Sequence, residues 1–178
     1  HVEAPTAGSI ILAGVLLKLG GYGLIRGVLP LFPAAFQSLA LPIGILAFVS
    51  IVYGALVAMA QWDFKKLIAY SSVNHMGYVT LGIVAAVAAT GTGTAGDLLA
   101  SRVAALDGAV LQMFNHGVIT GALFLLVGLI YDQRTHERDF RQLGSGLWRT
   151  VPKYGSCLIV AAFASVGRPT LAGFVSEC

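Results

Sequence analysis

Residues 6–29 read TAGSIILAGVLLKLGGYGLIRGVL. A bilayer core takes about 20 predominantly apolar residues as a helix, so this stretch predicts a membrane span. Similar stretches follow, and the sequence as a whole predicts spans at about residues 6–29, 39–61, 67–89, 108–131 and 152–178. No run alternates polar and apolar residues as the strands of a membrane barrel do. We therefore predict an all-α, polytopic helical bundle with about five spans, forming one transmembrane region over residues 1–178.

The composition also indicates a membrane protein. The 178 residues are 57% hydrophobic and 11% charged, and their mean hydropathy is +0.82. Soluble domains contain about 25% charged residues, and disordered chains need low hydrophobicity, so both classes are excluded. A net charge of +3 with scattered basic residues excludes a nucleic-acid binder. Cys157 and Cys178 have neither a metal-binding spacing nor the pattern of a disulfide framework.

The ends and the loops suggest how the chain is placed. It begins at His1 and stops within an apolar segment, so we expect an internal piece of a longer membrane protein. If the N-terminal end and the loops 61–66 and 132–153 share one side, that side carries seven basic residues and the other side two. The positive-inside rule then places the N-terminal end in the cytoplasm or an organelle matrix. The basic loop residues are Lys65, Lys66, Arg134, Arg138, Arg141, Arg149 and Lys153 on the first side, and Arg26 and Arg102 on the second.

Lys18 lies midway along the first expected span, too far from either end to reach an interface easily. A lysine at the centre of a membrane helix costs roughly 2.5–3.5 kcal/mol on insertion scales, and such residues mark ion pathways. A lysine can lose and regain a proton, whereas an arginine stays charged. The sequence therefore favours a proton-carrying Lys18, and leaves open a lysine permanently paired with a carboxylate on a neighbouring helix.

Two histidines occur on polar faces of consecutive expected spans. His75 lies in the third span and His116 in the fourth. Histidine titrates near neutral pH and has two ring nitrogens that can exchange protons, so together with Lys18 the pair predicts a hydrated proton relay. The alternative is that these faces only cross-link helices by hydrogen bonds. The other polar residues at helical spacing are Ser71, Asn74 and Tyr78 beside His75, and Gln112 and Thr120 beside His116.

The fifth span is interrupted near residues 167–173. Residues 165–173 read SVGRPTLAG, and Pro169 removes a backbone donor between two glycines. Broken helices at membrane depth are tolerated where they are buried in protein or line a water-filled site, as in transporters. Glu177 follows this break and is a candidate terminal group of the relay. A loop between two helices, with Glu177 at the interface, fits the same pattern.

Several motifs, in the same order, resemble a known family of membrane proteins. They are HVEAPTAGS at residues 1–9 leading into LAGVLLKLGGYG, DFKKLIAYSSVNHMGY at 63–78, NHG at 115–117 followed by ALFLLVG, and the pattern Tyr-Asp-x-x-Thr-His-x-Arg at 131–138. The chain closely resembles the subunit M family of bacterial NADH-quinone oxidoreductase, called subunit 4 in respiratory complex I. Mrp-type and hydrogenase-associated antiporter subunits are related, but the His-x-Glu-Ala-Pro start and the Thr-His-x-Arg loop favour the subunit M family.

The resemblance implies a piece of a fourteen-helix antiporter-like subunit, from its eighth helix to the start of its twelfth. Lys18 would be the central lysine, His75 and His116 the relay, and Glu177 the carboxylate on the broken helix. The function implied is proton pumping coupled to quinone reduction. The chain itself would carry no cofactor, because FMN, the iron–sulfur clusters and quinone belong to other subunits.

The implied surroundings follow from the same resemblance. The partners would be other membrane subunits of complex I, including neighbouring antiporter-like subunits, together with lipid and protons. The location would be the bacterial inner membrane, favoured over the mitochondrial one, with the N-terminal end on the cytoplasmic side. Two rival functions remain, namely a cation/proton antiporter subunit without a redox partner and a purely structural helix bundle.

One region departs from the family pattern. The break of the family reads LGLPG and leads into GFxGEF, whereas residues 166–170 read VGRPT and residues 173–178 read GFVSEC. Arg168 near Glu177 could form an ion pair that makes proton uptake harder. The departure therefore bears on Glu177 more than on Lys18.

Overall fold

The computed structural model describes residues 3–88, 95–131, 139, 141, 151–167 and 173. Within these residues the regular elements are helices, joined by turns and one isolated bridge between Asp63 and Asp139. The predicted all-α helical bundle is thus confirmed over the described part of the chain. The elements are α1 (Thr6–Ile11), η1 (Leu12–Leu16), α2 (Leu17–Gly23), η2 (Leu24–Val28), α3 (Leu29–Leu31), α4 (Pro33–Met59), α5 (Phe64–Ala88), α6 (Ala95–Ile130) and α8 (Pro152–Ser165).

The first five elements form a single rod, Thr6–Leu31, because the backbone stays in right-handed helical geometry at each junction. The segments η1 and η2 are π-helical, and they flank the short α2 that carries Lys18. Such π-turns insert an extra residue into a turn and occur frequently at functional sites. The rod ends at Phe32, because Phe32 leaves helical geometry just before Pro33 begins α4.

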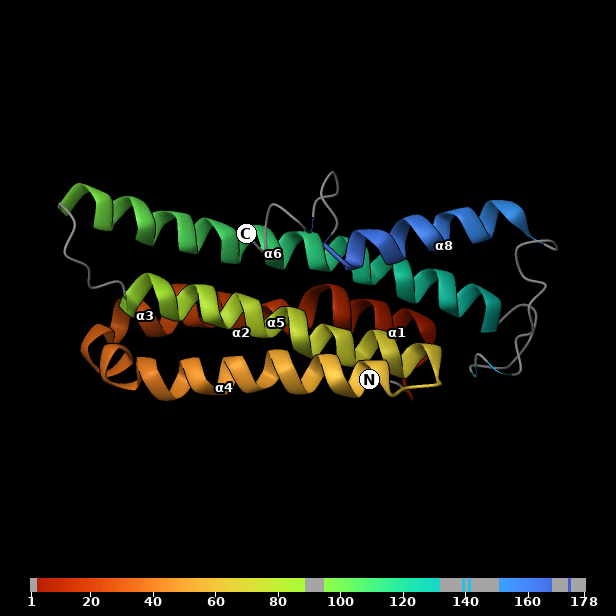
Figure 1. Cartoon of the computed structure of the whole chain (residues 1–178), viewed down its shortest axis with the longest axis horizontal. Coiled ribbons are helices and arrows are strands. Elements are labelled where there is room, and N and C mark those ends of the chain that lie inside the picture. The colour runs from red at the N-terminus through yellow and green to blue at the C-terminus, as the bar shows by residue number, and fades with distance from the viewer. Residues whose placement is uncertain are drawn as a thin grey trace.

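The helices run back and forth along one long axis, with α5 between α4 and α6 (Figure 1). The rod packs against α6 through α1 and η1, and α8 packs against α6 as well. The starts of α1, α5 and α8 and the ends of α4 and α6 gather at one end of the bundle (Figure 1). This is the up-and-down connectivity expected of helices joined by short turns.

Helices α4 and α5 approach closely through small residues. A Cβ on Gly54 would lie 2.8 Å from the backbone nitrogen of Asn74, and a Cβ on Gly77 would lie 3.0 Å from the carbonyl oxygen of Ala47. The hydroxyl of Ser50 also donates across the seam to the Val73 carbonyl, at 2.9 Å. Close packing and interhelical hydrogen bonds drive helix association in lipid, where apolar burial gives little advantage. The seam therefore fixes α5 against α4.

Two apolar clusters lie along α5 and α6. The first joins α4, α5 and α6, and the second joins η1, α5 and α6. His75 and His116 lie on α5 and α6 at positions between the residues of these clusters. The two clusters therefore hold these helices together on both sides of the histidines. The buried members are Phe36, Ala40, Val79, Ile83, Val84 and Ala109 in the first, and Ala13, Ile68, Leu123, Phe124 and Val127 in the second.

The helices extend beyond some of the predicted spans. Helix α6 begins at Ala95, well before residue 108, because hydropathy marks the apolar section of a helix and a helix can continue through charged residues such as Arg102. In the described part of the chain, three segments are long and apolar enough to cross a membrane, namely Thr6–Leu31, Pro33–Met59 and Ala95–Ile130. Helix α5 has the length, but polar residues interrupt its apolar sequence. The total number of spans stays a prediction.

Helix α8 ends where the sequence predicts an interruption. Its 14 residues extend about 21 Å at 1.5 Å per residue, less than the hydrocarbon core of a bilayer. The Val166 N–H still donates to the Ala162 carbonyl, and Gly167 then adopts a φ of 67°. A positive φ suits glycine and ends a helix. Arg168 and Glu177 lie outside the described residues.

Candidate functional site

Lys18 is the second residue of α2, which directly follows the π-helical segment η1. Its side chain is half-buried, and its Nζ donates a hydrogen bond to the carbonyl of Ala13 in η1. Among the described residues, no carboxylate pairs with Lys18. The ammonium therefore rests on a backbone carbonyl of its own rod. This differs from the permanent ion pair that the sequence left open.

Glycines bring Lys18 next to the histidine on α6. A Cβ on Gly117 would lie 3.0 Å from the Gly14 carbonyl oxygen and 3.7 Å from Cε of Lys18. The backbones of η1 and α6 therefore touch, and the stem of Lys18 passes over the residue that follows His116. Because neither glycine carries a side chain, the lysine and the histidine helix come together without an intervening layer.

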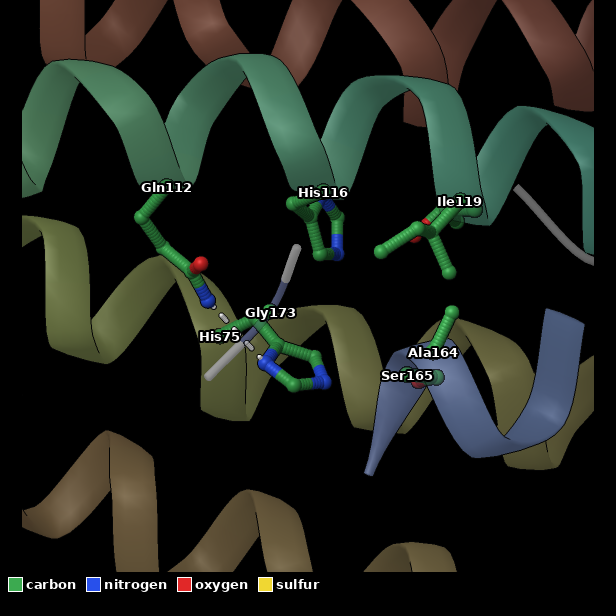
Figure 2. A pocket seen from close by; sticks show the side chains of 8 residues that line it. His75, Gln112, His116, Ile119, Ala164, Ser165 and Gly173 are labelled. Atoms are coloured by element: carbon green, nitrogen blue, oxygen red, sulfur yellow. Dashed lines mark hydrogen bonds between the residues drawn. The ribbon is translucent and has the colours of Figure 1, made fainter. Parts of the chain in front are cut away.

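The two histidines face each other between α5 and α6 (Figure 2). Their ring centroids are 5.3 Å apart and the ring planes are inclined by 50°. Gln112 precedes His116 by one turn of α6, and its Nε2 lies 3.3 Å from Nδ1 of His75. Residues four apart share a helix face, which explains why Gln112 and His116 reach the same space. The polar stripe predicted on α6 thus meets the predicted polar face of α5.

A small cavity of about 10 Å³, enough for about one water molecule, lies at this meeting point. His116 is only 4% exposed, and neither of its ring nitrogens has a hydrogen-bond partner among the residues that the structure describes. Buried polar atoms are nearly always hydrogen-bonded, by protein or by ordered water, so these nitrogens mark a place suited to water. The cavity is lined by His75, Gln112, His116, Ile119, Thr120, Ala164, Ser165 and Gly173.

A larger cavity of about 440 Å³ also reaches His75. His75 and Ser165 line both cavities, so His75 lies between them. The lining of the larger cavity is mixed, with polar groups mainly from α5 and apolar groups from α5, α6 and α8. The polar lining residues are Ser71, Asn74, His75, Tyr78 and Ser165. Three of them, Ser71, Asn74 and Tyr78, are the residues that the sequence analysis placed beside His75.

The burial of Lys65 is not predicted by the sequence, which places this residue in a loop. This residue is 6% exposed at the first turn of α5, and its Nζ donates to the Ala4 carbonyl at 2.6 Å. Asp63 accepts hydrogen bonds from the backbone N–H groups of Lys65 and Lys66, and thereby caps α5. The pair of adjacent lysines gives no sign of which one is buried, because that depends on where the N-terminal segment lies.

The structure brings together three of the four predicted site residues. Lys18, His75 and His116 meet where the rod, α5 and α6 pack, and the end of α8 completes the smaller cavity. Glu177 lies outside the described residues, although Gly173, four residues earlier, lines that cavity. Among the described residues, no group of three or more His, Cys, Asp or Glu side chains could hold a metal ion. The arrangement supports proton transfer between bases held close together.

Comparisons with known proteins match the whole chain. A family model described as "NADH:quinone oxidoreductase/Mrp antiporter, TM" matches residues 1–178. NADH-quinone oxidoreductase subunit M of Rhodobacter capsulatus is 50% identical over 177 residues, which are 99% of this chain and 31% of that protein. The protein of the same name from Pseudomonas aeruginosa is 46% identical over 180 residues, 99% of this chain and 31% of that protein.

A more distant relative has a similar extent. NADH-ubiquinone oxidoreductase chain 4 of Chondrus crispus is 40% identical over 177 residues, 99% of this chain and 32% of that protein. The chain thus spans about a third of the length of the curated relatives that it matches.

Proposed function

We propose that this chain has a proton-translocating role, because it belongs to the NADH:quinone oxidoreductase/Mrp antiporter membrane family. In the form proposed, the chain is part of a membrane subunit of an NADH-quinone oxidoreductase and carries protons when quinone is reduced. Lys18, His75 and His116 form the relay, and Glu177 is its terminal group. The relatives that carry the name of this enzyme support the assignment of the complex.

One observation carries the proposal. The imidazoles of His75 and His116 lie 5.3 Å apart, and the stem of Lys18 passes over Gly117, next to His116. Three groups that can each gain and lose a proton are therefore held in sequence across the packed helices. Such groups are expensive in a membrane interior unless they serve a pathway or form fixed partners.

The states of Lys18 and His116 support proton transfer over fixed pairing. The Lys18 ammonium binds a carbonyl of its own rod, and this contact can open without separating any helices. The ring nitrogens of His116 are buried and face a cavity suited to water. A structural cross-link would instead use both nitrogens on neighbouring helices.

The remaining parts of the proposal rest on the family resemblance. Glu177 would exchange protons with one side of the membrane. FMN, the iron–sulfur clusters and the quinone would be held by other subunits, and the partners would be other membrane subunits, including neighbouring antiporter-like ones. The membrane would be the bacterial inner membrane, with the N-terminal end of this chain on the cytoplasmic side.

Replacing Lys18 in the full-length subunit tests the function. In membranes containing the assembled complex, we expect Lys18→Ala to lower the protons pumped per NADH oxidised by about tenfold or more, because a proton carrier is lost. Lys18→Arg should be nearly as harmful, since arginine keeps its proton. Lys66→Ala is the control, because Lys66 is exposed at the start of α5.

The same membranes separate the rival functions. A normal ratio of protons to electrons in Lys18→Ala would reject the role of Lys18. Sodium-dependent transport by purified complex without NADH oxidation would select a cation/proton antiporter. If substitution of His75 or His116 lowered the amount of complex but left the pumping of each assembled complex intact, the bundle would be structural.

A further inference from the structure

We propose that Gln112 gates His75, because its side-chain amide must turn each time His75 takes up a proton at Nδ1. This inference rests on the proposed function and adds a positioning residue to the relay. It starts from the contact between Gln112 Nε2 on α6 and His75 Nδ1 on α5, at 3.3 Å (Figure 2).

The direction of this hydrogen bond fixes the resting form of His75. An amide nitrogen carries two hydrogens and only donates, so Nδ1 of His75 must accept. In a neutral imidazole one nitrogen accepts and the other carries the hydrogen. The ring proton of His75 therefore lies on Nε2, and Nδ1 is occupied by the Gln112 donor. In this state His75 cannot receive a proton at Nδ1.

Proton uptake changes Nδ1 of His75 from a hydrogen-bond acceptor into a donor. Two donors, Nδ1–H of His75 and the N–H of Gln112, would then face each other at 3.3 Å and could not form a hydrogen bond. A half-turn of the amide about its Cγ–Cδ bond brings Oε1 to Nδ1 and restores the bond. The oxygen and nitrogen of the amide have almost the same size, so the turn needs little extra room. This matters because Gln112 is only 3% exposed.

The position of Gln112 makes this turn part of the pathway. Gln112 and His116 share one face of α6, and both line the cavity that His75 also lines. As the amide turns, Nδ1 of His75 takes a proton from water in this cavity, and the imidazolium gives its Nε2 proton to water on the other side of the ring. The neutral ring then holds its hydrogen on Nδ1 and returns to the Nε2–H form by passing that hydrogen through cavity water to Nε2. The amide is chemically unchanged and turns back at this step. Transfer through His75 is thereby limited to moments when the Gln112 oxygen faces the ring.

The test uses two substitutions in the full-length subunit within the assembled complex. Gln112→Met keeps the length of the side chain but removes both the donor and the acceptor. Gln112→Glu keeps a polar contact to His75, but an ionised carboxylate can only accept, so it would hold the imidazolium and retain its proton. Ser72→Ala is the control, because Ser72 is a buried α5 residue that bonds only to the Ile68 carbonyl of its own helix among the described contacts.

We expect both Gln112 variants to assemble and to lower proton pumping about tenfold, the lower end of the 10- to 100-fold loss seen when the orienting partner of a metal-bound histidine is removed. Turnover in H₂O relative to D₂O should rise in Gln112→Met, since proton transfer at His75 becomes limiting. Ser72→Ala should pump normally. Normal pumping by Gln112→Met, recovery in Gln112→Glu, or an unchanged isotope ratio would each overturn the gate.

The outcome is distinguishable from failure of the relay itself. If Lys18→Ala pumps normally, the proposed function fails whatever Gln112 does. If Lys18→Ala loses pumping while Gln112→Met retains it, the relay stands and the gate alone is wrong.

Discussion

Lys65 and Lys18 both place an ammonium on a backbone carbonyl, but the two carbonyls belong to different kinds of segment. Lys65 at the start of α5 reaches Ala4, which precedes the first helix by two residues. Lys18 on α2 reaches Ala13, five residues earlier in the same rod. Lys65 is buried, whereas Lys18 is half-buried and lies along the residue next to His116.

The difference separates a lysine with a structural contact from the lysine proposed to carry protons. The Lys65 contact joins two segments that are 61 residues apart, so losing it frees the N-terminal segment from α5. The Lys18 contact joins two turns of one helix, which the backbone already holds together. Lys18 can therefore change partner without loss of the fold, as a residue must if it carries a proton. The comparison predicts opposite defects when the two lysines are replaced.

The largest expected effect on assembly comes from Lys65→Met. Methionine fills a similar volume but removes the hydrogen bond from the Lys65 ammonium, while the Ala4 carbonyl keeps the longer bond from the Ser9 hydroxyl at 3.3 Å. A hydrogen bond that involves a charged group contributes about 1.5–3 kcal/mol. We expect several-fold less complex in the membrane, measured by native gel electrophoresis, and normal pumping for each complex that assembles. This is the reverse of the defect expected for Lys18→Ala.

Lys66→Met is the matched control, because Lys66 is the exposed neighbour in the same turn of α5. Equal amounts of complex in Lys65→Met and Lys66→Met would show that the contact between Lys65 and Ala4 does not contribute to assembly. Loss of pumping by assembled Lys65→Met complexes would place Lys65 in the pathway and erase the distinction between the lysines.

A smaller effect, on pumping alone, is expected from Gly117→Ala. The added methyl group would lie 3.0 Å from the Gly14 carbonyl oxygen and 3.7 Å from Cε of Lys18. The rod must then shift by a few tenths of an ångström, and the lysine moves away from His116. We expect pumping to fall about two- to fivefold, since misplacing reacting groups by 1 Å can cost about 100-fold in rate and this shift is smaller. Proton uptake on addition of NADH measures it.

Gly121→Ala is the control one turn further along α6. Its added methyl group would meet only Ile10, at 4.0 Å, which is ordinary contact. Equal pumping in the two variants would mean that the approach of the rod to α6 does not set the position of Lys18. The comparison between the lysines would then rest on their hydrogen bonds alone.

The sequence predicted the all-α class and the polar faces of α5 and α6 that carry His75 and His116, because both depend on local patterns. Apolar length predicted the helices, and the four-residue spacing of Gln112 and His116 predicted their shared face. Which helix faces which depends on tertiary packing. Local patterns therefore do not predict that the Gln112 amide reaches His75, nor that the rings of His75 and His116 lie 5.3 Å apart.

Two features of the structure could not be predicted from the sequence, namely the π-turns and the burial of Lys65. The π-turns η1 and η2 have no residue pattern of their own, because their geometry depends on packing: η1 packs against α6, and Leu24 and Ile25 of η2 pack against the first apolar cluster. The burial of Lys65 depends on a segment 61 residues away, and a charged residue beside a membrane span is normally exposed to the interface. Both features depend on contacts between distant parts of the chain.

The smallest expected effect belongs to Arg141, whose guanidinium carbon lies 3.8 Å from the centroid of the Trp62 ring. Trp62 is 57% exposed, and a cation–π contact at such a site contributes about 0.5–1 kcal/mol. Arg141→Ala should therefore leave pumping unchanged and lower the thermal stability of the purified complex only slightly, measured by loss of activity on heating.

Arg141→Ala acts near the start of α5, as Lys65→Met does. Arg141 and Lys65 both attach a distant segment next to Asp63, but one contact is exposed and the other is buried. If Arg141→Ala lowered the amount of complex as much as Lys65→Met, attachment at this end would depend on the loops and not on the buried ammonium. A clear difference between the two assigns the stability of this end to Lys65, because a hydrogen bond from a buried ammonium contributes more than an exposed ring contact.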